Sequence, residues 1–174
     1  MPQRSAVREH PRAGASCALP RVVVLACGNV SRGDDGIGPA LLRRLEALAL
    51  PHVTAVEDYQ LQIEHALDLE SADLALFIDA GEGTPGPFTF TEIAPARALQ
   101  HTTHAMSPEA VLQVLSQITE RAPPPSFVLC VRGESFELGK SMSREAEANS
   151  EAAWELLTRL LGCPEAGSWR GLTP

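Results

Sequence analysis

Residues 27–39 read CGNVSRGDDGIGP and mark the point where a strand-like segment gives way to a helix. The preceding run, Val22 to Ala26, is entirely apolar, which is typical of a strand covered on both faces. Glycine-rich turns after such a strand usually hold a phosphate group. This turn carries two adjacent carboxylates, Asp34 and Asp35, which would repel a phosphate. Its function must therefore differ from phosphate binding.

The composition favours one globular domain and excludes several classes of partner. The 174 residues carry a net charge of −8, which makes the surface a poor match for nucleic acid or an anionic membrane. No apolar run approaches the roughly 20 residues that span a bilayer. The four cysteines lack CxxC spacing, so we expect buried thiols in a reducing compartment and no disulfide framework.

The hydrophobic pattern predicts an α/β fold. Apolar or alternating runs predict five strands, at 22–27, 53–58, 74–80, 88–93 and 126–131. Amphipathic segments and caps predict four helices, beginning at Pro39, spanning 63–69, beginning at Pro108 after a Ser107 cap, and spanning 143–161. This order implies three α/β/α layers around a mostly parallel twisted sheet, in which 88–93 is antiparallel and near an edge.

The expected domain organisation is simple. We expect a flexible N-terminal extension at 1–20, a single α/β domain at 21–162 and an irregular C-terminal tail at 163–174. If the second and third strands flank the first, a crevice opens between strands one and three, where such sheets bind ligands.

Two carboxylates are expected to face that crevice. Asp35 (or Asp34) follows the first strand and Asp79 ends the third. The glycine spacing does not match GxGxxG, which argues against a dinucleotide site. Together with His101 or His104, the carboxylates would hold a cation such as nickel or zinc and leave coordination positions open. In the alternative interpretation these acids only cap local turns and the histidine is a polar loop residue.

These motifs resemble those of the [NiFe]-hydrogenase maturation endopeptidases over about residues 21–162. The family's first motif corresponds to Gly28-Asn29 followed by GDDGIGP at 33–39. Its third-strand acid corresponds to Asp79 in FIDAG, and its histidine to His104 in THAMSPEAVL.

The resemblance implies a cytoplasmic endopeptidase that removes the C-terminal extension of a hydrogenase large-subunit precursor after nickel has entered it. The acidic surface and modest size favour a monomer. Nickel would come with the substrate and would not be a permanent cofactor. Asp35, Asp79 and His104 are the implied metal-contacting and catalytic residues, and His101 is the alternative to His104. Asp34 is expected to orient the turn, and with Gly28 and Asn29 it belongs to a weaker set of recognition residues.

One segment departs from the family pattern. Many members have Asp-Gly-Gly-Thr after the second strand, whereas residues 57–69 here read EDYQLQIEHALDL, with Asp58 as the matching acid. This version resembles the branch that serves NAD-linked bidirectional hydrogenases, and we expect Asp58 to help select the precursor. His65 is interpreted as a solvated helix residue.

Two other functions remain open from the sequence. One is a non-catalytic, nickel-dependent docking or chaperone protein for hydrogenase assembly. The other is a metallo-hydrolase with a resident metal of its own. A cysteine protease is not expected, because Cys27 and Cys130 lie within apolar strands without a neighbouring base.

Overall fold

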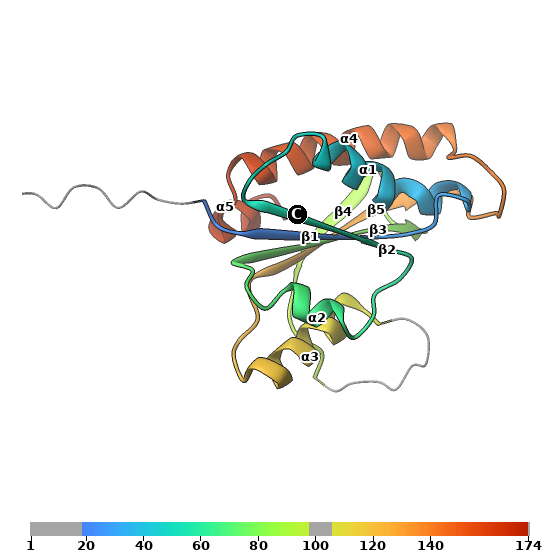
Figure 1. Ribbon diagram of the computed structural model, residues 1–174. Helices are drawn as coiled ribbons and strands as arrows, with labels where there is room; N and C mark the ends of the chain where they lie inside the picture. The colour runs from blue at the N-terminus through green and yellow to red at the C-terminus, as the bar shows by residue number, and fades with distance from the viewer. Residues whose placement is uncertain (1–18, 98–105, 174) are drawn as a thin grey trace, which may run out of the picture.

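A central sheet with helices on both faces forms the protein (Figure 1), and the computed structural model describes residues 19–97 and 106–173. The sheet has five strands in the order β2-β1-β3-β5-β4. Their bounds are β1 (Val22–Cys27), β2 (Val53–Asp58), β3 (Leu74–Glu82), β4 (Phe88–Ile93) and β5 (Ser126–Gly133). The predicted strands are confirmed, and β3 and β5 each run two residues further than expected.

The first strand lies between the second and the third, and both are parallel to it. The chain therefore leaves β1 toward one side of the sheet and later returns to the other side. This reversal places the topological switch point at the carboxyl ends of β1 and β3, as the sequence predicts. Cys27 is paired with Asp58, so β1 and β2 end at the same level, whereas β3 continues beyond Ile78, the partner of Ala26, to Glu82.

The fourth strand is antiparallel to β5 and lies at the edge of the sheet. Its alternating sequence, FTFTEI, suits an edge strand because only one of its faces is packed. The sheet is thus mostly parallel with one antiparallel pair, and the predicted fold class is confirmed.

Two helical layers cover the sheet (Figure 1). The helices α1 (Ile37–Glu46), α4 (Arg144–Gly162) and α5 (Ala166–Arg170) lie on one face, and α2 (His65–Asp68) and α3 (Pro108–Thr119) on the other. A short 3-10 turn, η1 (Gly33–Gly36), precedes α1. None of the helices in the described ranges is long and apolar enough to cross a membrane.

Two helix starts differ from the sequence prediction. Because η1 runs directly into α1, the helix begins at Ile37, and Pro39 occupies its first turn, where a missing N–H still costs nothing. The second helix is only a single turn, since residues before His65 form a loop. The Ser107 cap is as predicted, and its hydroxyl accepts a hydrogen bond from the Ala110 N–H at 3.2 Å.

The expected irregular tail is instead an ordered part of the core. Residues Ala166–Arg170 form α5, and the side chain of Trp169 is fully buried. Its indole N–H donates to the carbonyl of Leu160 at 2.9 Å, and its ring packs edge-on against Phe90 and Phe127. The sequence interpretation missed this because proline and glycine near 163–171 suggest loop, while burial of one aromatic ring stabilises the short helix.

We predict that Trp169→Ala lowers the free energy of unfolding by about 3–5 kcal/mol, because it empties a large buried site. Urea unfolding followed by circular dichroism measures the change. Trp154→Ala is the matched control, since Trp154 is only half-buried and stacks under the Arg44 guanidinium. A loss at Trp169 no larger than at Trp154 would show that α5 does not anchor the core.

Candidate functional site

Close backbone packing explains why the turn after β1 is rich in glycine. Gly28 has a φ of +143°, and a Cβ there would lie 1.9 Å from the carbonyl oxygen of Asp35. A Cβ on Gly38 would lie 2.4 Å from the carbonyl oxygen of Cys27. The glycines therefore let η1 and α1 lie directly on the ends of the strands, a position that a side chain would block.

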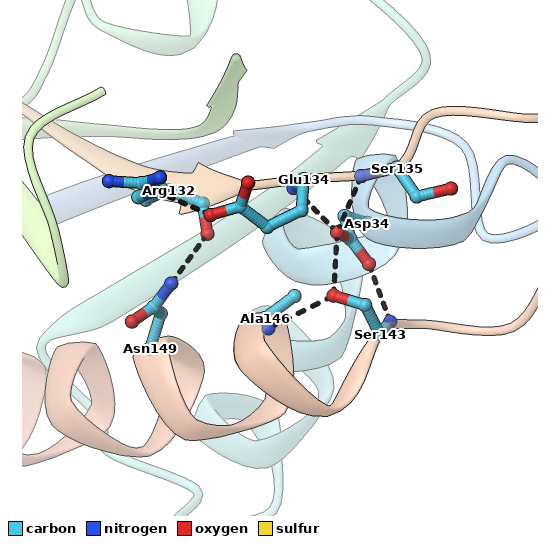
Figure 2. Close-up of polar contacts among 7 residues, drawn as sticks. All are labelled: Asp34, Arg132, Glu134, Ser135, Ser143, Ala146 and Asn149. Atoms are coloured by element: carbon cyan, nitrogen blue, oxygen red, sulfur yellow. Dashed lines mark hydrogen bonds and ion pairs between the residues drawn. The ribbon is translucent and has the colours of Figure 1, made fainter. Parts of the chain in front are cut away.

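The first acid of the pair, Asp34, is completely buried and hydrogen-bonded (Figure 2). Its carboxylate accepts hydrogen bonds from the backbone N–H groups of Glu134 at 2.7 Å, Ser135 at 2.9 Å and Ser143 at 2.6 Å. The Ser143 hydroxyl donates a fourth bond at 2.9 Å. Asp34 thus ties η1 to the loop between β5 and α4.

These contacts keep Asp34 ionised. Burial by itself raises the pKa of Asp34, but the N–H groups of Ser143, Glu134 and Ser135 and the Ser143 hydroxyl lower it, and the net pKa lies below its ordinary value. A carboxylate with these bonds and no exposed surface does not touch a partner directly. Asp34 therefore shapes the turn, and any influence on substrate recognition is indirect.

The second acid, Asp35, is turned the other way and is only partly buried. One of its carboxylate oxygens accepts a hydrogen bond from the Asn29 N–H at 3.0 Å. The Asn29 side chain in turn accepts from the Ser31 N–H at 2.9 Å. Asn29 thus orders the turn in front of Asp35, and among the described residues this is the one hydrogen bond to the Asp35 carboxylate, which leaves lone pairs available for a ligand.

The third-strand acid, Asp79, is near Asp35. Its side chain reaches the surface, and one oxygen accepts a hydrogen bond from the Ala80 N–H at 2.8 Å. Desolvation is the main cause that raises the pKa of Asp79 to about 6; the Ala80 bond opposes it and the negative charge of Asp35 adds to it. The charge effect shows that the two carboxylates are within electrostatic reach of each other.

The buried thiol of Cys27 lies near Asp35, Asp79 and a third acid, Asp58. Its pKa is raised to about 12, mainly by burial and then by the charges of Asp79, Asp58 and Asp35. Asp58 is the register partner of Cys27 on β2. The carboxyl ends of β1, β2 and β3 therefore gather three acids around one thiol, which stays protonated at neutral pH and is no nucleophile.

An apolar pocket of about 150 Å³ lies beside Asp79 on the face covered by α2 and α3. Cys27 and Cys130 line it, and burial raises the pKa of the Cys130 thiol as well. Its apolar walls come from Leu25, Leu61, Phe77 and Val128. The site thus combines carboxylates at the crevice with a hollow of a size that suits one apolar side chain.

The predicted histidine ligand remains untested. His101 and His104 both lie outside the described residues. Within 19–97 and 106–173, no three acidic, histidine or cysteine side chains are arranged to hold a metal ion. The structure thus brings together Asp35 and Asp79, and their use as metal ligands stays a prediction.

Sequence reasoning misjudged one residue of this region, His65. The side chain is buried and lies next to Asp58, whereas a solvated position was expected. Charged neighbours on either side of it, Glu64 and Asp68, suggested an exposed face. The sequence contained one indication of this contact. His65 follows Asp58 by seven residues, which is enough chain for a loop that brings the two side chains together.

Comparison with solved structures identifies the architecture. The chain has the fold of the [NiFe]-hydrogenase maturation proteases. It matches the maturation protease HycI from Thermococcus kodakarensis with a TM-score of 0.64 and 22% identity, over 84% of this chain and 95% of that one. For a hydrogenase 2 maturation peptidase from a Thaumarchaeota archaeon the TM-score is 0.59 and the identity 27%, over 82% and 99% of the two chains.

A third solved structure has the same fold, and one curated protein matches over a shorter segment. The maturating endopeptidase HybD from E. coli matches with a TM-score of 0.62 and 23% identity, over 80% of this chain and 91% of that one. Among curated proteins, the coenzyme F420 hydrogenase subunit delta of Methanothermobacter thermautotrophicus is 34% identical over 64 residues, 37% of this chain. The chain spans only 30% of that relative's length. No protein-family model matches the sequence.

We predict that Asp34→Asn lowers the free energy of unfolding at pH 7 by about 2–4 kcal/mol, because an amide group would replace an ionised acceptor of buried N–H groups. The pKa of Asp34 is lowered in the folded state, so its stabilisation is present above the unfolded value of about 3.9. It is lost as the pH falls from there toward the folded-state pKa. Urea unfolding at pH 7 and pH 3 measures both effects.

The matched control for Asp34 is Asp68→Asn, which changes an exposed acid on α2 and should alter stability by less than about 0.5 kcal/mol. Equal effects of the two substitutions at pH 7 would contradict a structural function for Asp34.

We predict the opposite sign for Asp79→Asn. The folded state raises the pKa of Asp79 to about 6, so an ionised Asp79 destabilises the fold above that pH. Because the side chain is solvent-accessible, the gain from removing its charge at pH 7.5 is about 1 kcal/mol after screening. The gain should vanish near pH 4, where Asp79 is protonated in the folded protein. Destabilisation that is larger at pH 7.5 than at pH 4 would contradict this assignment.

Proposed function

We propose that this protein is an endopeptidase that removes the C-terminal extension from the precursor of a [NiFe]-hydrogenase large subunit. The observation that carries the proposal is the pair Asp35 and Asp79, whose carboxylates interact at the topological switch point of a hydrogenase-maturation-protease fold. Similarity to structures of hydrogenase maturation proteases supports peptide hydrolysis as the reaction. The proximity of Asp35 and Asp79 supports the end of the sheet as the place where the peptide bond would be cut.

Nickel bound in the precursor is the recognition element in this proposal. Asp35 and Asp79 offer two oxygen donors, and His104 is the proposed third ligand. One imidazole and two carboxylates leave coordination positions open for ligands that the precursor brings with the metal. Nickel is therefore part of the substrate, and its presence reports that the precursor is mature before the peptide bond is cut.

Water is the proposed nucleophile. The thiols of Cys27 and Cys130 both have raised pKa values, so neither supplies a thiolate at neutral pH. A carboxylate or the precursor's metal would polarise the water that attacks the scissile carbonyl. The apolar pocket beside Asp79 would hold a side chain of the precursor near the bond to be cut.

The segment that follows β2 is the proposed specificity element. Leu61, Ala66 and Leu69 anchor it in the core, while Tyr59, Ile63 and Leu67 are 74%, 62% and 61% exposed. This exposed apolar face lies next to Asp58 at the end of β2 and would pack against the precursor. Because the segment resembles that of the NAD-linked branch, the proposed substrate is the large-subunit precursor of a soluble bidirectional hydrogenase. The proposed form of the enzyme is a cytoplasmic monomer.

We predict that the purified protein shortens a nickel-loaded precursor of an NAD-linked hydrogenase large subunit and leaves the nickel-free precursor intact. Mass spectrometry of the large subunit reads out the cut. Asp35→Asn should slow cleavage by at least about 100-fold because it removes a metal-contacting charge. Glu155→Gln, which changes an exposed acid on α4 on the other face of the sheet, should cleave at the normal rate.

Three results would contradict this function. An unchanged precursor mass with binding intact would favour a docking protein. Stoichiometric zinc in the freshly purified protein, measured by elemental analysis, would favour a hydrolase with a resident metal. Equal cleavage of nickel-free precursor would remove nickel as the recognition element.

A further inference from the structure

The buried histidine on α2 has a fixed orientation. His65 is 4% exposed, and its Nδ1 accepts a hydrogen bond from the Gln62 N–H at 2.8 Å. Since Nδ1 is an acceptor, the ring hydrogen is on Nε2. Burial restricts the ring, and the backbone contact determines which edge faces inward. The Nε2 edge of the ring therefore has a fixed position.

The Nε2 edge of His65 lies close to the carboxylate of Asp58. The Nε2 atom of His65 lies 3.5 Å from Oδ2 of Asp58. The same carboxylate accepts hydrogen bonds from the Tyr59 N–H at 2.6 Å and from the Gln62 side-chain amide at 3.4 Å. The segment from Asp58 to His65 thus folds back around one carboxylate, and His65 is its buried end.

Among the residues that the structure describes, the contacts of Asp58 leave part of its acceptor capacity unused. A carboxylate offers about four lone-pair sites; among the described residues the hydrogen bonds from Tyr59 and Gln62 occupy two of them, and Nε2 of His65 lies 3.5 Å from Oδ2. The side chain is 30% exposed, whereas that of His65 is 6% exposed. The carboxylate of Asp58 is therefore accessible to solvent at the end of β2, where Cys27 is its register partner, while His65 is enclosed.

We propose that His65 is a positioning residue that holds Asp58 so that its partly exposed carboxylate accepts an N–H donor from the precursor chain. This inference rests on the proposed function and adds a residue to its specificity element. His65 itself does not touch the precursor. Its contribution is to prevent the carboxylate of Asp58 from rotating away, which pre-organises a charge-assisted hydrogen bond.

Two isosteric variants separate the two edges of the imidazole. The amide nitrogen of glutamine can replace Nε2–H, so His65→Gln keeps the donor to Asp58. The amide oxygen of asparagine can replace Nδ1, so His65→Asn keeps the acceptor for the Gln62 N–H and loses the donor. We expect His65→Asn to raise the KM for the nickel-loaded precursor about tenfold with kcat nearly unchanged, because the lost contact is made equally in the ground and transition states. His65→Gln should raise KM less than threefold.

A double-mutant comparison shows whether His65 acts through Asp58. If it does, Asp58→Asn raises KM by itself and His65→Asn has no further effect in that background. The proposal would be overturned if His65→Asn raised KM equally in the wild-type and Asp58→Asn backgrounds. A larger increase in KM for His65→Gln than for His65→Asn would also overturn it. Thermal unfolding of every variant identifies any that fail to fold.

A measurement without substrate keeps the test independent of cleavage. Nitrogen-15 NMR of labelled histidine should show the hydrogen of His65 on Nε2, and Asp58→Asn should shift the Nε2 resonance. A hydrogen on Nδ1 or an unshifted resonance would overturn the contact itself. If these signals are as expected and the wild-type chain nevertheless cleaves no precursor, the proposed function fails, and with it the role in recognition, while the contact stands.

Discussion

The buried carboxylate of Asp34 is the contact on which the site depends. It joins η1 to residues 100 to 109 positions further along the chain, through three backbone N–H groups and one hydroxyl. Because Ser143 is also the N-cap of α4, the same cluster fixes where that helix begins. With Asp34 held inside, the next residue, Asp35, is turned toward the crevice. The turn after β1 carries two adjacent carboxylates because they have different functions. Asp34 is buried and hydrogen-bonded, whereas Asp35 remains accessible to a ligand.

Neighbouring acids of this site have opposite environments. Asp34 loses its contact with solvent but gains four donors, so its pKa falls. Asp79 accepts one backbone hydrogen bond and lies near Asp35, so desolvation and like charge raise its pKa to about 6. The first arrangement stabilises the fold, whereas the second stores unfavourable electrostatic energy that an incoming cation would relieve. Such a division between a stabilising and a destabilising acid is typical of functional sites.

The architecture of this chain is shared with the maturation proteases, whereas the segment after β2 is different. Solved structures with 20–27% identity share the architecture of this chain. Its own sheet order places the crevice at the carboxyl ends of β1 and β3. The segment from Asp58 to Leu69 lies beside that crevice and departs from the glycine-rich pattern of many maturation proteases. Its buried side includes His65, and its outer side exposes Tyr59, Ile63 and Leu67. Differences among such enzymes in the substrate they accept are expected where a rigid scaffold carries a variable loop.

The sequence by itself determined the strand order along the chain, the α/β class and the acids at the ends of β1 and β3. These features follow from local hydrophobic periodicity and from the rule that ligands bind at the carboxyl edge of a parallel sheet. Only the tertiary structure decided which acid of the pair is buried, that Trp169 belongs to the core and that His65 faces Asp58. Each of these depends on a partner remote in sequence or on a chain reversal, and burial of a side chain is set by what packs over it, which no local pattern encodes.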